Sequence, residues 1–229
     1  MSLAGSGAVA IWHDIAPEGR DEFYAWHGRE HMPERVAIPG FLRGRRYIAP
    51  GESPEYFNLY ETESPATVTG ADYRARLDNP TPWTVATVKH FRGVARSLCR
   101  VAASAGEGDG GLIATLRYDV EATRAAAHER RLADALQALA MQPGVAGAHL
   151  LVADEAASAV ETAEKKVRAE KNLIPPWIVL IEGWGDASPF AAFCREQAGG
   201  ALFADAVGGP ALGIYHLQNT RGKSAKGNS

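Results

Sequence analysis

The feature that most constrains the fold is a duplication, because the chain holds two copies of one order of predicted strands and helices. Apolar runs predict a strand over residues 8–15 and another over residues 112–120, each with an aspartate just before its end. Each strand leads into a predicted helix, over residues 17–37 in the first copy and 122–142 in the second. The two halves are therefore expected to share one fold.

Both predicted helices end at a Pro-Gly pair, Pro39-Gly40 and Pro143-Gly144. A strand, a strand, a helix and a strand are predicted to follow: residues 41–48, 56–61, 65–77 and 94–101 in the first copy, and residues 145–152, 177–182, 189–206 and 211–217 in the second. The order βαββαβ makes a four-stranded antiparallel sheet with both helices on one face. We therefore predict an α+β fold of two tandem ferredoxin-like βαββαβ repeats.

Each such sheet would leave one apolar face bare, and a bare face of that size needs cover. Two sheets in one chain can cover each other. We therefore expect the sheets to face each other in a barrel or sandwich around a shared hollow, with four helices outside.

The domain boundaries follow from composition. Repeat 1 spans residues 1–103 and repeat 2 spans residues 112–219. Residues 104–111 are rich in glycine, which predicts a flexible linker. The polar and basic tail, residues 220–229, predicts disorder.

Repeat 2 also carries an insertion near residues 154–172 that is rich in Ala, Glu and Lys, the strongest helix formers. Glu161 with Lys165, and Glu164 with Arg168, have the spacing of i,i+4 ion pairs on a helix. Two interpretations stay open, a solvated helical excursion and a lid over a pocket.

Composition excludes several classes of partner. The formal net charge is -3, so no overall positive field attracts nucleic acid or an anionic membrane. The longest apolar stretch, residues 173–181, is too short to span a bilayer. Cys99 and Cys194 are too few for a disulfide framework, and the first residues show no secretion signal. We expect a cytoplasmic protein that acts on a small molecule, with no nucleic-acid or membrane partner.

The densest group of chemically active side chains lies near the end of the first predicted helix. His27 and His31 are four residues apart, so they share one helix face with Phe23. His13 lies on the strand before, and we expect Met32-Pro33 to break or kink the helix just after His31. An imidazole on an apolar face can instead be a core residue that hydrogen-bonds a carbonyl, and this alternative is strongest for His27.

The segments 27–35, 38–41 and 79–83, with sequences HGREHMPER, IPGF and NPTPW, resemble the dimeric α/β-barrel superfamily, especially EthD-like and related members. The resemblance is detailed over residues 8–101 and limited to element order in the second half. It implies a pocket between sheet and helices and places the superfamily's helix-1 histidine on His31. That superfamily includes cofactor-free monooxygenases, isomerases, cyclases, dehydratases and haem enzymes. Because residues 130–142 lack the histidine, we expect one site for the two repeats.

Aromatic residues are candidates for the wall of a substrate pocket, although core packing is the alternative for each. They are Trp12, Trp26, Tyr47, Tyr60 and Trp83. Trp83 lies in a proline-framed loop that would fix its ring. On the predicted second strand, Arg43 and Arg45 alternate with Arg46, so a substrate carboxylate or a solvated sheet edge can explain them.

We predict no metal and no cofactor. His27 and His31 have the spacing of a metal-binding pair, but the sequence supplies no third ligand. His149 or His216 could serve as an axial haem ligand, yet neither lies in a haem motif. The linker glycines also lack the context of a phosphate-binding loop.

These observations lead to one main hypothesis, a cofactor-independent enzyme that moves a proton on a small apolar or aromatic metabolite by isomerase, cyclase, dehydratase or lyase chemistry. His31 would be the general acid/base, and His27 or His13 would orient it or bind the substrate. We expect the ring of His31 to point into the shared hollow. The alternatives are a non-catalytic ligand-binding module and an oxygenase that works without a cofactor or with haem. A homodimer is the expected assembly.

Overall fold

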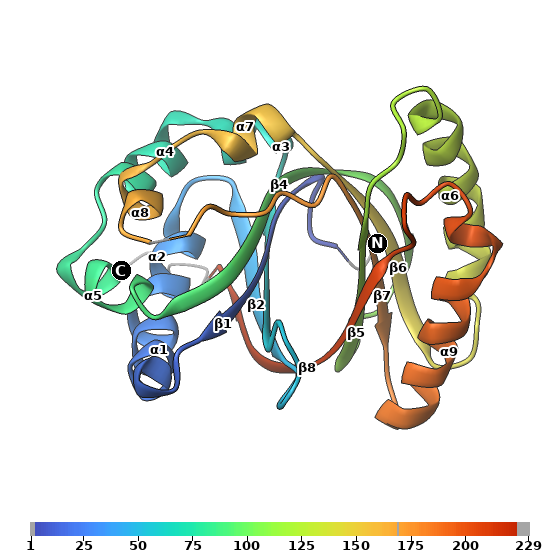
Figure 1. The fold of residues 1–229 in the computed structure, drawn as a ribbon, viewed down its shortest axis with the longest axis horizontal. Coiled ribbons are helices and arrows are strands. Elements are labelled where there is room, and N and C mark those ends of the chain that lie inside the picture. The colour runs from blue at the N-terminus through green and yellow to red at the C-terminus, as the bar shows by residue number, and fades with distance from the viewer. Residues whose placement is uncertain (1–2, 169, 224–229) are drawn as a thin grey trace, which may run out of the picture.

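The computed structural model describes residues 3–168 and 170–223. Eight antiparallel strands close into one barrel in the order β1-β3-β2-β8-β5-β7-β6-β4, with helices on two opposite sides (Figure 1). The strands are β1 Gly7–Ile15, β2 Phe41–Ile48, β3 Tyr56–Thr62, β4 Phe91–Gly106, β5 Leu112–Tyr118, β6 Val145–Ala153, β7 Trp177–Gly183 and β8 Ala211–Gly222. The helices are η1 Pro17–Gly19, α1 Arg20–Trp26, η2 His27–His31, α2 Met32–Ala37, α3 Pro65–Thr69, α4 Ala71–Asp78, α5 Pro82–Val88, α6 Ala125–Ala140, α7 Glu155–Ala159, α8 Ala163–Lys166, α9 Ala187–Gly199 and η3 Ala201–Phe203.

The predicted α+β class and the closed pairing of two βαββαβ halves are confirmed. In the first half, α1 to α5 cover the outer face of β1, β3, β2 and β4, and in the second half α6 and α9 cover the outer face of the other sheet (Figure 1). One further helix pair departs from the repeat, since α7 and α8 follow β6 in the chain but lie beside α3, α4 and α5 (Figure 1).

Each half ends in a long strand that also pairs with the other half. β4 pairs with β1 and, from Cys99 to Gly106, with β6. β8 pairs with β5 and, from His216 to Gly222, with β2. Two predicted boundaries were therefore wrong, because β4 takes the first residues of the expected linker and β8 takes the first residues of the expected tail. Residues 224–229 of that tail lie outside the described residues.

The barrel interior is packed with side chains, so the expected hollow is wrong. Its residues alternate along each strand with residues that face the helices, as a period of two requires. Trp12 stacks on Phe57 with ring centroids 4.9 Å apart, and Tyr215 lies 5.9 Å from the same ring. Tyr47, Ile113, Leu151 and Ile178 complete much of this apolar centre.

One end of the interior is charged. Arg45 is 2% exposed, and it pairs with Glu61 at 2.9 Å and with Glu182 at 2.7 Å. Burial alone would raise the pKa of Glu182, but the hydrogen bond to His149 and the charge of Arg45 outweigh it and lower that pKa to about 2. The prediction of a solvated sheet edge fails for Arg45 because β2 lies between β3 and β8 in a closed barrel.

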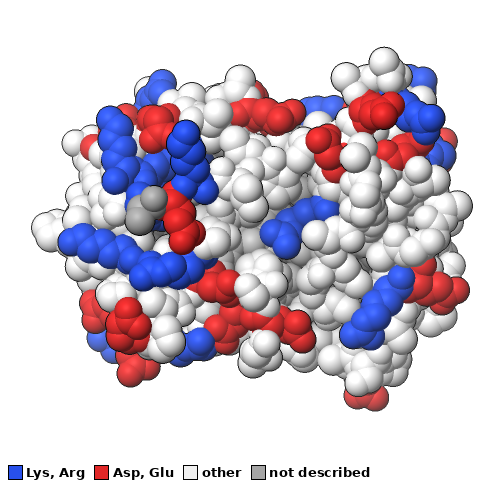
Figure 2. All heavy atoms as spheres, in the orientation of Figure 1, with Lys and Arg blue, Asp and Glu red and all other residues white. Residues whose placement is uncertain are grey.

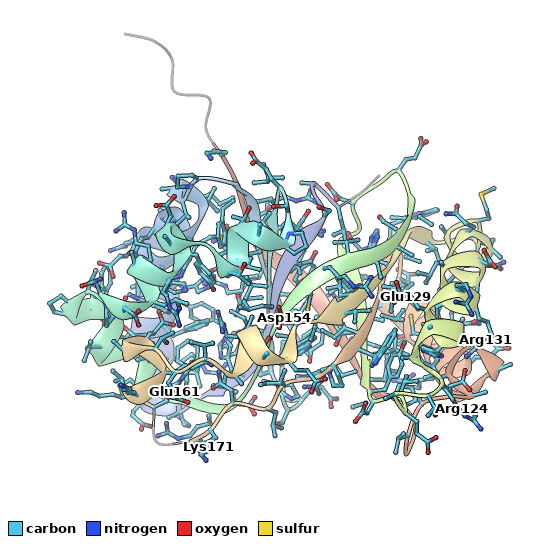
Figure 3. The ribbon with its side chains drawn as sticks, turned by 90° about the horizontal axis from the view of Figure 1, so that it is seen from above. Arg124, Glu129, Arg131, Asp154, Glu161 and Lys171 are labelled. Atoms are coloured by element: carbon cyan, nitrogen blue, oxygen red, sulfur yellow. The ribbon has the colours of Figure 1, made fainter. Side chains whose placement is uncertain are left out.

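The insertion packs on the first half. It forms two short helices, and Figure 3 shows Asp154, Glu161 and Lys171 following it across the N-terminal half. Glu129 and Arg131 on α6, and Arg124 just before that helix, lie at the other end (Figure 3). The hydroxyl of Ser158, 1% exposed, accepts a hydrogen bond from the Leu98 backbone at 2.8 Å. These contacts contradict a solvated excursion and show a cover over the outer face of the first sheet.

The surface carries charges of both signs, interspersed on the face that Figure 2 shows. Within residues 3–168 and 170–223, we find no helix with the length and apolar character needed to cross a bilayer.

Candidate active site

The first helix changes its winding at the histidine motif. Between α1 and α2, residues His27–His31 form a π-helical turn, in which the Met32 N–H donates to the carbonyl of His27. Pro33 explains the change, because it has no N–H and its ring would collide with the Arg29 carbonyl in a regular α-helix. Of the predicted break or kink at Met32-Pro33, a break is not observed. The winding changes over His27–His31 instead, and the helical region ends at Ala37, as the sequence predicted. Single π-turns occur frequently at functional sites.

This turn directs two imidazoles toward the sheet. The rings of His27 and His31 lie 5.6 Å apart, and both residues are buried. Trp26 packs against His31 with ring centroids 4.2 Å apart, and its indole N–H donates to Thr84 on α5 at 3.1 Å. The hydrogen bond to Thr84 thus fixes the aromatic ring that packs against His31.

The strands supply the other side of the site, the outer face of the first sheet. His13 on β1, Arg46 on β2, and Asn58 and Tyr60 on β3 are all buried there. Asn58 Nδ2 lies 2.9 Å from His13 Nε2. Adjacent strands bring these side chains together because each points away from the barrel interior.

The hydrogen bonds define the tautomer of His27. Arg46 Nη1 lies 3.2 Å from His27 Nδ1, and a guanidinium can only donate, so Nδ1 accepts. The proton of the neutral ring therefore sits on Nε2, which donates to the Tyr60 hydroxyl at 3.3 Å. Both nitrogens of His27 are thus engaged.

His31 differs, because its Nδ1 is buried without a hydrogen-bond partner. Burial, and then the positive charge of Arg35, lower the pKa of His31 well below its ordinary value. Burial and the charge of Arg46 do the same for the pKa of His27, and burial lowers the pKa of His13 to about 3. At neutral pH the site therefore holds three uncharged imidazoles, one with an unused ring nitrogen.

Arg46 is a buried cation that no carboxylate neutralises within the described part of the chain. Its polar partners are the side-chain oxygen of Gln218 at 2.7 Å and His27. The rings of Phe23 and Tyr24 flank its guanidinium at 5.5 and 5.0 Å. Burial lowers the pKa of Arg46, and no carboxylate in the described structure offsets that burial. Such a group favours a ligand with negative charge.

The insertion near residues 154–172 packs against the helix that carries the histidines. Arg35 on α2, 3% exposed, forms an ion pair with Glu164 on α8. The Arg35 guanidinium also lies 5.9 Å from the ring of Tyr73. Tyr73 and Arg96 line a pocket of about 190 Å³ between α4, β4 and the insertion. Tyr73 links this pocket to Arg35, but neither Arg35 nor His31 lines it.

The structure brings together five of the residues that the sequence singles out, His13, His27, His31, Trp26 and Tyr60. It separates the other three. Trp12 and Tyr47 lie inside the barrel, and Trp83 lies on α5, not in a loop, where its indole N–H donates to Glu22. Sequence reasoning missed Asn58 and gave Arg46 no role beside the histidines, although alternation along β3 places Asn58 on the face of Tyr60.

Neither histidine considered for haem fits an axial role. His149 Nδ1 lies 2.8 Å from the Ser104 hydroxyl, and its Nε2 lies 3.5 Å from Glu182, so both nitrogens are engaged inside the barrel. His216 is exposed on β8. The described residues also contain no group of three or more His, Cys, Asp or Glu side chains placed to hold a metal ion.

The chain matches no family model and no curated protein sequence. Among solved structures, one described as anthrone oxidase-like has a TM-score of 0.63 and 14% identity, covering 97% of this chain and 95% of that chain. This chain has the dimeric α/β-barrel fold. A candidate monooxygenase of Fusobacterium nucleatum has a TM-score of 0.52 and 8% identity, with 96% of each chain covered. A chlorite dismutase variant of Candidatus Nitrospira defluvii has a TM-score of 0.53 and 10% identity, covering 94% and 91%. These identities show the fold alone, and the EthD-like assignment stays a prediction.

Proposed function

We propose that this dimeric α/β-barrel chain is an enzyme that removes a proton from a small aromatic substrate without an organic cofactor, with His31 as the base. The observation that carries the proposal is the unused, buried Nδ1 of His31. Its ring lies 5.6 Å from that of His27, which contacts Arg46, a guanidinium that lacks a carboxylate. A neutral imidazole can accept the proton, and Arg46 can stabilise the enolate or phenolate that remains.

The low pKa of His31 fits this role. It arises from burial and from Arg35, in a site with no substrate anion. A substrate anion formed next to His31 would offset the charge of Arg35 and favour the protonated ring. Return of the proton at another atom then completes an isomerisation or cyclisation, and loss of a leaving group completes a dehydration.

Oxidation by dioxygen is a second candidate, because an electron-rich anion of this kind can react with oxygen directly. The neighbour described as anthrone oxidase-like supports this candidate. The balanced reaction would be anthrone plus one dioxygen giving anthraquinone plus one water. It begins with the same proton abstraction by His31.

Anthrone is therefore the probe for both candidates. Under argon in D₂O, we expect the chain to speed deuterium exchange at the anthrone methylene, followed by NMR. The His31→Gln variant should lose about 10²- to 10⁴-fold of that rate while its melting temperature stays within a few degrees. His216→Gln, which changes an exposed histidine outside the site, should keep the rate.

Admitting oxygen then separates the candidates. Oxygen uptake equal to the anthraquinone formed supports the oxidase, and exchange without uptake supports proton transfer alone. Saturable binding of anthrone with no exchange above the buffer rate would overturn catalysis and leave a binding module. Full activity in His31→Gln would overturn the role of His31.

A further inference from the structure

A second uncompensated arginine lies at the other end of the barrel interior. Arg117 on β5 faces inward, and its guanidinium lies 5.1 Å from the ring of Trp12. Its Nε atom is buried without a hydrogen-bond partner. No carboxylate pairs with it among residues 3–168 and 170–223, whereas Arg45 at the opposite end pairs with Glu61 and Glu182. A partly buried cation without an anion lowers stability unless a ligand supplies the charge.

A pocket of about 360 Å³ opens at Arg117. It lies between the β2–β3 connection, β5, the start of β8 and α9. Arg195 on α9 is a second cation on its wall, and Leu212 and Ile214 give it apolar surface. Glu52 is its acidic lining residue, but it forms no salt bridge with either arginine in the described structure. The volume is within the range of small-molecule sites.

The pairing of β8 explains why the pocket exists. Residues 211–215 pair with β5, but β2 joins β8 only from His216 onward, so the start of β8 has one side without a paired strand. The Tyr215 hydroxyl, which donates to the Pro54 carbonyl at 3.1 Å, fixes one wall. Gly213 makes room for that ring, since a Cβ there would lie 2.6 Å from it.

We propose that this pocket binds a small organic carboxylate with an apolar body, and that Arg117 holds the carboxylate while Arg195 attracts it at the rim. A guanidinium matches a carboxylate through two parallel hydrogen bonds, and the pocket excludes water from part of that contact. The site is independent of the histidine site, because it lies at the barrel interior and under α9 of the second half.

Benzoate is the probe, measured by calorimetry on the full chain. We expect saturable binding with one site per chain, at least tenfold weaker in Arg117→Gln and several-fold weaker in Arg195→Gln. Benzamide has the same shape without the charge and should bind at least tenfold more weakly than benzoate. Arg100→Gln, at an exposed arginine outside the pocket, and His31→Gln should both bind benzoate as the unmodified chain does.

A thermal measurement gives a second readout. Without benzoate, Arg117→Gln should melt at the same temperature as the unmodified chain or higher, because the substitution removes an uncompensated charge. If Arg117→Gln does not fold, Arg117→Lys takes its place. This variant keeps the positive charge but lacks the planar guanidinium, so it should bind benzoate more weakly than the unmodified chain. Absence of saturable benzoate binding, equal binding of benzamide, or unchanged affinity in both Arg117 variants would overturn the proposal.

Discussion

The outer faces of the two sheets occupy the same place in the repeat and have opposite character. His13 pairs with Tyr56 across β1 and β3, and Tyr118 pairs with Trp177 across β5 and β7. By the same correspondence, Arg46, Asn58 and Tyr60 are replaced by Leu150, Val179 and Ile181. The second set packs with Leu132, Leu136 and Phe190 from α6 and α9.

The two faces therefore contribute differently to the stability of the fold. The second face buries apolar side chains against two long helices, which stabilises the fold. The first face buries imidazoles, an arginine and an amide against short helices, at a cost in stability. The second half thus supplies apolar packing that the first half, with its buried polar groups, has less of.

The largest expected effect is on acid stability. The pKa values of His13, His27 and His31 lie below those of the unfolded chain, so the unfolded state binds protons first as the pH falls below about 6.5. The free energy of unfolding therefore keeps its full value, as far as these histidines are concerned, above that pH, and it decreases as the pH falls toward 3. The three residues together should cost on the order of 6 kcal/mol between pH 7.5 and 5.

Urea unfolding across this pH range checks the prediction. His13→Gln should lower the pH slope by about one proton, because one histidine no longer binds a proton on unfolding. A flat stability between pH 6.5 and 5 would contradict the burial of the cluster.

The sheet faces that point into the barrel carry a matching glutamate in each half. Removing one of these glutamates should give the next largest loss of stability. Glu61 and Glu182 occupy matching positions, and both contact Arg45. Glu182→Ala should lower the free energy of unfolding by about 3–5 kcal/mol, since it leaves a buried guanidinium with one partner fewer. Urea titration at pH 7.5 measures it.

The matched control removes both charges. Arg45→Met with Glu182→Leu should be less destabilising than Glu182→Ala alone, because Glu61 keeps Arg43 at 2.8 Å. A double variant that is less stable than the single one would show that the network is more than an internal charge pair.

The smallest expected loss of stability comes from breaking ion pairs between the two halves of the chain. Glu164→Gln leaves Arg35 buried without its carboxylate and should cost about 1–3 kcal/mol. Glu129→Gln breaks the exposed pair with Arg100, where the side chains are 30% and 44% exposed, and should cost less than about 1 kcal/mol. Equal losses in parallel thermal or urea unfolding would show that the insertion is held no more firmly than a surface pair.

The order of elements was predictable from the sequence because strand alternation, helix periodicity and the Pro-Gly stops are local signals. The site was only partly predictable. Adjacent strand residues point to opposite faces, so choosing His13 already argued against Trp12, and that rule was available. The role of Arg46 was not, because its burial depends on β8, a strand far along the chain.

Two further features depend on packing between the halves. The hydrogen bond of the π-turn at His27–His31 joins residues five apart, whereas an α-helical hydrogen bond joins residues four apart. The spacing of residue types in the sequence does not distinguish these two patterns. The position of the insertion over the first sheet follows from contacts such as Ser158 with Leu98, between segments distant in sequence. Composition predicted its helices but could not place them.

β4 of the first half pairs with β6 of the second, and β8 of the second half pairs with β2 of the first. Both contacts between the halves are therefore made within a single polypeptide. An assembly of two identical subunits must carry the same residues on both outer faces, so a substitution that improves one face alters the other as well. Joining the subunits removes that constraint. Each face can then change alone, so one chain can keep an apolar, helix-packed face on one side and a face of buried histidines and arginine on the other.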